Sequence, residues 1–135
     1  MLRLFSGVAL LGAILMATVS AHHSPGAAFV MDQLITVEGT LNKVDWVNPH
    51  VLVRLTGKDN RGKTGEWVFE AHPPSWFRRA GVGRQDFNKG VGQAVTITGM
   101  PARDGTTFAY FKRITFPDGT FLQFAEETET PAVQR

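Results

Sequence analysis

The chain has 135 residues, of which 43% are hydrophobic and 19% charged, and its formal net charge is +2 with no cysteine. This composition fits one globular domain and excludes a disordered chain. The lack of cysteine excludes a disulfide framework, a thiolate metal site and a cysteine nucleophile. The charge is too balanced for the concentrated positive surface of a nucleic-acid binder, so we expect no nucleic acid partner.

The first 21 residues have the pattern of a secretory signal peptide. A single basic residue, Arg3, precedes an apolar run from Val8 to Ala17, and small residues end the segment at Ala21. We therefore predict a signal peptide over 1–21, a mature chain that starts at His22, and a periplasmic or secreted location. An uncleaved membrane anchor is the alternative, but the apolar run is shorter than the ~20 residues that a span needs. We expect no stable membrane anchor.

Residues 22–33 follow the predicted cleavage site and begin with His22-His23-Ser24-Pro25-Gly26. Proline and glycine discourage regular structure, so we expect a mobile N-terminal arm over 22–33. The domain itself is predicted over residues 34–124.

A long strand opens this domain. The segment from Leu34 to Val47 alternates apolar and polar residues, and the alternation shifts phase close to Gly39. A phase shift beside a glycine predicts a β-bulge. Asn48-Pro49 ends the strand, because proline has no N–H for the ladder.

The next two strands can be placed in register from their own alternation. Val53 and Leu55 in one strand, and Trp67 and Phe69 in the other, all face the core when 53 lies opposite 69. A polar, glycine-rich loop over 57–65 joins the two strands.

The same register predicts what lies on the opposite face. It puts His50 opposite His72 and Leu52 opposite Glu70, with Arg54 beside them, all pointing away from the core. Directly opposed residues have Cβ atoms ~4.5–5.5 Å apart, close enough for two imidazoles to share a metal ion. We also expect Arg54 and Glu70 to form a cross-strand ion pair on this surface.

A short helix is predicted after the third strand. Ser75 is the expected N-cap of a helix over 76–80, and Gly81 ends it. A turn over 84–90 then leads to the next strand.

The last part of the chain returns to strands. Segments 94–99 and 107–116 read as strands, and Pro117-Asp118-Gly119 predicts a hairpin that pairs 120–124 with the preceding strand. Residues 125–135 are expected to form a disordered acidic tail.

This element order is typical of an OB-fold. The predicted fold class is all-β: a small OB-fold-like Greek-key barrel with one short helix between the third and fourth strands and an added C-terminal hairpin. A small sandwich or an open meander sheet is the alternative. We expect the aromatic residues in the barrel core rather than in a base-stacking platform. OB-folds bind many kinds of ligand, so the fold alone selects no function.

Several motifs are spread over the predicted mature chain. They are His22-His23-Ser24, Gly39, Trp46-x-Asn48-Pro49-His50, Trp67-x-x-Glu70, Arg79-x-Gly81, Gly99-x-Pro101-Ala102-x-Asp104-Gly105 and Asp118-Gly119. Together they resemble an uncharacterised family of small exported bacterial proteins, catalogued as a domain of unknown function. The resemblance implies a bacterial envelope protein with a small β-barrel, and it implies no particular activity or substrate.

The four histidines suggest a metal site. An N-terminal histidine offers its amine and its ring nitrogen to one metal ion, a chelate that suits copper. We expect the arm to fold back so that His22 or His23 meets His50, with His72 as a further ligand. The predicted function is therefore an exported, non-catalytic metal-binding protein, with copper as the first choice and zinc as the alternative. The alternatives without a metal site are that His50 satisfies backbone groups at a tight corner and that His22-His23 is an incidental polar terminus.

A second hypothesis belongs to a different class. The domain would be an accessory OB-like module that binds an envelope protein partner or a small ligand through a face with Trp46, Asn48, Arg54 and Glu70. A hydrolase is poorly supported, because Ser24 and Ser75 are the only serines after the predicted cleavage site and Ser75 is better used as a cap. We therefore assign no catalytic residue.

Overall fold

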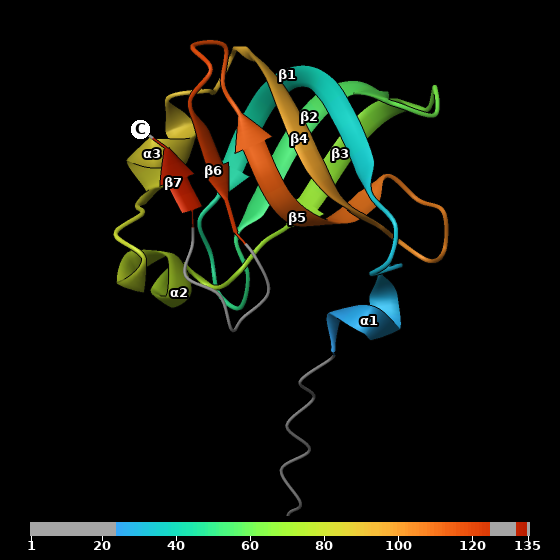
Figure 1. Cartoon of the computed structure of the whole chain (residues 1–135), viewed down its shortest axis with the longest axis horizontal. Helices are drawn as coiled ribbons and strands as arrows, with labels where there is room; N and C mark the ends of the chain where they lie inside the picture. Colours follow the sequence, from blue (N-terminus) through green and yellow to red (C-terminus); the bar gives the residue numbers. More distant parts are fainter. Residues whose placement is uncertain (1–23, 125–131, 135) are drawn as a thin grey trace, which may run out of the picture.

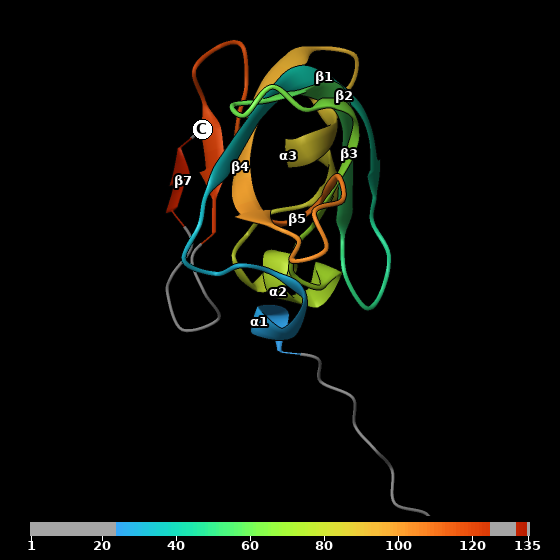
Figure 2. The same cartoon turned by 90° about the vertical axis from the view of Figure 1, so that its right-hand side faces the viewer.

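The computed structural model of the chain describes residues 24–124 and 132–134. Within this part of the chain, seven strands form one sheet in the order β3-β2-β1-β4-β5-β6-β7. The strands are β1 (Ile35–Asp45), β2 (Leu52–Asp59), β3 (Thr64–Glu70), β4 (Ala94–Pro101), β5 (Phe108–Thr115), β6 (Phe121–Gln123) and β7 (Ala132–Gln134). An additional parallel pairing of β3 with β5 closes β1–β5 into a barrel, which Figure 2 views along its interior. The prediction of a small all-β, OB-like barrel is confirmed.

Three short helices lie outside the barrel strands in the described residues: α1 (Pro25–Ala28), α2 (Pro74–Arg79) and α3 (Arg84–Asn88). The segment between β3 and β4 thus contains two helices where one helix and a turn were predicted. Ser75 lies inside α2 and is not its N-cap, because the helix begins one residue earlier at Pro74, whose fixed φ suits the first helical position. α3 is supported at its start by Asp86, whose carboxylate accepts a hydrogen bond of 2.8 Å from the N–H of Gly83.

The strand register agrees with the sequence pattern. Val53 pairs with Phe69 and Leu55 with Trp67, as predicted. The expected bulge is also present in β1, where the register against β2 shifts between Leu41 and Lys43. This is where the buried face passes from Leu41 to Val44, so the bulge lies at the predicted change of phase.

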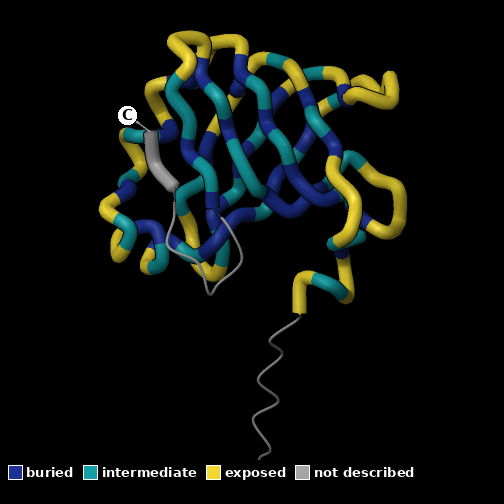
Figure 3. Tube along the Cα trace, viewed as in Figure 1, coloured by how far each residue is buried: buried dark blue, intermediate teal, exposed yellow. Residues whose placement is uncertain are grey.

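The core has two parts. The inward side chains of the barrel strands form the larger part, and Phe77 of α2 and Phe87 of α3 pack against them with 0% exposure. Figure 3 shows how buried and more exposed residues alternate along the strands. A separate, smaller cluster lies on the outside of the barrel and contains Phe29, Met100, Ala102 and Tyr110. Phe111, Phe116 and Phe124 are therefore in the barrel core, as predicted, whereas Tyr110 belongs to the outer cluster and Phe108 packs against it.

The N-terminal arm is more ordered than predicted. It contains α1, and Phe29 forms an isolated antiparallel bridge with Ala102. The backbone N–H of Val30 donates to the carbonyl of Pro101 at 2.9 Å, and that of Arg103 donates to the carbonyl of Ala28 at 2.9 Å. The arm is held because Phe29, at 2% exposure, buries its ring on the barrel.

The C-terminal segment also differs from the expectation of a disordered tail over 125–135. Residues 132–134 form β7, which pairs antiparallel with β6. Residues 1–23, 125–131 and 135 lie outside the described residues, and with them the predicted signal peptide, His22 and His23. No helix in the described ranges is long and apolar enough to span a membrane.

Candidate functional site

The corner between β1 and β2, residues 46–50, is fixed from the inside and exposed on the outside. Trp46 turns inward, with ring centroids 5.5 Å from Phe77 and 5.9 Å from Phe87. Val47 is 49% exposed, Asn48 and Pro49 are also exposed, and the Asn48–Pro49 peptide bond is cis. The ring of Trp46 therefore anchors the start of the corner to the core, while the residues that follow it are exposed.

His50 ends this corner and is paired with Glu70. The Nδ1 atom of His50 lies 2.9 Å from Oε1 of Glu70, and the two side chains are 42% and 24% exposed. Because a carboxylate oxygen accepts, Nδ1 carries the proton in this contact. In the neutral ring, Nε2 then has a free lone pair. The predicted alternative, in which His50 satisfies backbone groups at the corner, is not what the ring does: its partner is a carboxylate.

His72 takes a different position from the predicted one. It is 5% exposed and stacks on Trp76 with ring centroids 4.1 Å apart, with Tyr110 at 6.0 Å on another side. The prediction that His72 points away from the core is wrong. The cause is at the end of the β2–β3 ladder, where Val51 donates its N–H to the carbonyl of His72 but accepts from the N–H of Ala71. Two residues thus oppose one, as in a bulge, and the simple alternation ends there.

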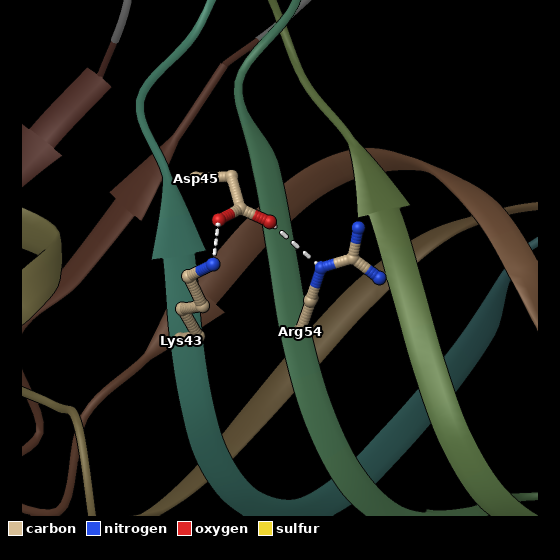
Figure 4. Close-up of polar contacts among 3 residues, drawn as sticks. All are labelled: Lys43, Asp45 and Arg54. Carbon is tan, nitrogen blue, oxygen red and sulfur yellow. Dashed lines mark hydrogen bonds and ion pairs between the residues drawn. The ribbon is translucent and has the colours of Figure 1, made fainter.

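Arg54 and Glu70 do not form the predicted ion pair. The Nε atom of Arg54 donates to Oδ2 of Asp45 at 2.8 Å, and Lys43 contacts the other oxygen of the same carboxylate (Figure 4). The hydrogen bond from Arg54, followed by that from Lys43, lowers the pKa of Asp45 below its usual range. Glu70 therefore contacts His50 rather than Arg54, and Asp45, for which no partner was predicted, contacts the two basic residues.

The outer face continues from this pair of contacts to the N-terminal arm. In the parallel β3–β5 pairing, Glu70 lies beside Tyr110 and Val68 beside Phe108. The ring of Phe29 lies 5.5 Å from that of Tyr110 and 5.4 Å from that of Phe108. Tyr110 consequently lies next to the arm and to the buried ring of His72. In the sheet it also lies beside Glu70, the residue that contacts His50. Figure 1 shows α1 at the edge of the barrel, near the point where the chain enters β1.

Sequence reasoning missed three residues of this region. Asp45 follows the bulge of β1, and only its side chain geometry reveals it as the partner of Arg54. Phe29 is a single aromatic residue in a segment rich in small residues, a signal that we did not use. Tyr110 was assigned to the barrel core with the other aromatics.

The described residues contain no group of three or more histidine, cysteine, aspartate or glutamate side chains that are placed to hold a metal ion. His50 with Glu70 is thus a potential donor and its supporting carboxylate, and the described residues do not complete it with a group of three such side chains.

Comparison with known proteins places the chain in a family. No curated protein and no solved structure shows significant similarity to it. A family model, described as a family of unknown function, matches residues 11–111, which include the corner, His50, Arg54 and Glu70. This match covers most of the chain and agrees with the resemblance drawn from the motifs, so the protein belongs to the family of unknown function DUF6152.

Proposed function

We propose that this protein is an exported, periplasmic, non-catalytic metal-binding protein that binds copper through His50 and the N-terminal histidines His22 and His23, with zinc as the alternative metal. The observation that carries the proposal is the contact of 2.9 Å between Nδ1 of His50 and Glu70. Histidines that bind metals almost always donate their other ring N–H to a carboxylate, a backbone carbonyl or a water, which fixes the tautomer and the ring orientation and makes the ring a better ligand. His50 has this arrangement, and its side chain is 42% exposed.

The docked arm supports the second part of the proposal. Phe29 is packed on Tyr110, which lies beside Glu70 in the next strand. Neighbouring strands are ~4.8 Å apart, and an extended residue spans at most ~3.6 Å. Phe29 therefore anchors the arm a few strand spacings from His50, and the residues that precede Phe29 lead back to the predicted mature N-terminus. An N-terminal amine, its imidazole and a second imidazole are the nitrogen ligands that suit Cu²⁺.

His72 has no ligand role in this proposal. Its ring is 5% exposed and lies among Trp76, Phe77 and Tyr110, so a metal ion would have to displace those contacts to reach it. His72 instead fixes α2 against the end of β3.

The alternative is an accessory module that binds an envelope protein or a small ligand. It is favoured by the exposed corner, where Val47 is 49% exposed next to Asn48. Trp46 contributes little to such a face because its ring packs on the core. The two functions are separated by the N-terminus: an added residue ahead of His22 disrupts the amine chelate of the first and leaves the second intact.

The test is a titration of Cu²⁺ and Zn²⁺ by calorimetry into protein that was exported, so that its N-terminus is authentic. We expect one ion to bind below micromolar Kd, and His50→Ala to lose this binding. Electron paramagnetic resonance of the copper form reports the nitrogen ligands. Binding no tighter than that of a free His-His-Ser peptide, or full binding by His50→Ala, would overturn the proposal.

A further inference from the structure

The guanidinium group of Arg54 is held on one edge and open on the other. Its Nε atom donates to Asp45 at 2.8 Å, and neither terminal nitrogen forms a hydrogen bond with a described residue. Figure 4 shows both terminal nitrogens on the side away from Asp45, near the arrowhead of β3. Lys43 contacts the second oxygen of Asp45, so this carboxylate is shared between two cations. The orientation of Arg54 is therefore fixed, while its terminal N–H groups form no hydrogen bond with a described residue.

Glu70 does not take up these N–H groups, although it lies close by. Arg54 pairs with Val68 across the β2–β3 ladder, and Glu70 is two residues further along the same face. Such diagonal neighbours are ~7–8 Å apart, within reach of a long side chain. Glu70 is instead bound to His50. Asp45 and Glu70, the carboxylates nearest Arg54, thus have partners among the described residues, and the open edge of Arg54 and Nε2 of His50 are left for a ligand.

The surface between these two groups is apolar. Leu52 lies between His50 and Arg54 along the chain, and Val68 lies opposite Arg54; both side chains are partly exposed. Along a strand the rise is ~3.4 Å per residue, so Leu52 and Arg54 are separated by about 7 Å. The ring of His50 contacts Glu70, which lies opposite Leu52, so Leu52 and Val68 lie on the surface between the two open groups.

We propose that His50 and Arg54 form the two ends of one site that takes a metal ion together with a small carboxylate chelator, of the amino-acid or hydroxy-acid class. The metal is held at Nε2 of His50. One carboxylate oxygen of the chelator binds the metal, and the carboxylate accepts hydrogen bonds from the terminal nitrogens of Arg54. Arginine suits this role because its planar group offers two parallel N–H donors to one carboxylate.

This inference rests on the proposed function and adds the substrate class: the protein takes up the metal as a chelate. It has a thermodynamic consequence. If preloading with the chelator tightens the binding of copper to the protein by some factor, the protein must tighten the binding of the chelator to copper by the same factor, because the coupling is reciprocal.

The experiment measures the Kd of Cu²⁺ alone and of Cu²⁺ preloaded with one equivalent of glycine, on exported protein. Glycinamide, which lacks the carboxylate, is the matched chelator. We expect glycine to tighten binding by about tenfold, within the usual range of such couplings, and glycinamide to give no such gain.

Two arginine variants complete the test. Arg54→Gln removes the fork, and we expect the ratio of the two Kd values to fall to about one. Arg54→Lys keeps the charge but lacks the two parallel N–H donors of the guanidinium group, so we expect glycine to tighten copper binding by only part of the wild-type factor. Arg79→Gln is the control, because Arg79 is an exposed residue of α2 with no ion pair to a described residue. It should behave as the wild type does.

The outcomes separate the two proposals. Copper binding by wild type that glycine does not tighten, or a gain that Arg54→Gln retains, would overturn the chelate site and leave the metal function standing. No copper binding by wild type in either form would overturn both. Circular dichroism of each variant identifies any loss of fold.

Discussion

The contact between His50 and Glu70 gives the most specific prediction. Glu70→Gln keeps the size of the side chain and removes the charge that holds Nδ1 of His50. Loss of the carboxylate that supports a metal-binding histidine typically costs 10–100-fold in metal affinity. Because the two side chains are 42% and 24% exposed, solvent screens the pair, and we expect the lower end of that range. The predicted cost is therefore about tenfold in the Kd for copper, or about 1.4 kcal/mol.

The assay is competition for Cu²⁺ against a chromophoric chelator, with Glu66→Gln as the matched control. Glu66 lies on the same strand, is exposed and forms no ion pair with a described residue, so its removal should leave the Kd unchanged. A partly exposed ion pair contributes at most about 1 kcal/mol to stability, so both variants should remain folded at room temperature. If Glu70→Gln binds copper as tightly as Glu66→Gln does, the role assigned to this carboxylate is refuted.

Three further predictions address the arm and the ion pairs. One extra residue ahead of His22 should weaken copper binding by at least tenfold, because the amine no longer shares a chelate with the adjacent imidazole; calorimetry against the authentic N-terminus measures it. Phe29→Ala should lower the free energy of unfolding by about 3 kcal/mol and also weaken copper binding, whereas Phe29→Leu should retain most of both; urea denaturation with titration of each variant decides. Asp45→Asn should destabilise the protein at neutral pH only: the pKa of Asp45 is lowered in the fold, so its contribution is present above the ordinary value of 3.8 and is lost as pH falls below it. The denaturation midpoints of the two proteins should draw together as the pH falls below 3.8, and a difference that stays constant as the pH is lowered would contradict the assignment.

Much of the fold followed from the sequence because alternation constrains a closed barrel strongly. The register of Val53 against Phe69 could be derived because a slip by one residue would expose the apolar side chains of one strand. α3 was taken for a turn, since glycines at 83 and 90 flank a segment of only a few residues. Its helical form depends on burying Phe87 in the barrel, which is a tertiary effect.

The candidate site was predictable only in part. His50 and Glu70 were both singled out, but their contact with each other was not, because we expected Glu70 to pair with Arg54. The bulge in β1 brings Lys43 opposite Arg54, and Asp45 then lies within reach of the guanidinium group. The alternation of apolar and polar residues does not determine which of two nearby carboxylates an arginine contacts.

The errors at His72 and in the arm have a common origin in local departures from regular structure. His72 lies one residue past the regular ladder, where Val51 faces two residues, so extending the register to it was not justified. The arm has glycine and proline, which suggested mobility, but a single buried ring at Phe29 is enough to hold it on the barrel.

The most direct test of the central claim is pulsed electron paramagnetic resonance of the copper-loaded protein, which detects the ring nitrogen of a bound imidazole that does not touch the metal. The account predicts that one such signal arises from Nδ1 of His50, disappears in His50→Ala and shifts in Glu70→Gln, because the hydrogen bond to that nitrogen has changed. A spectrum of copper-loaded protein that is the same in wild type and His50→Ala would show that His50 does not bind the metal.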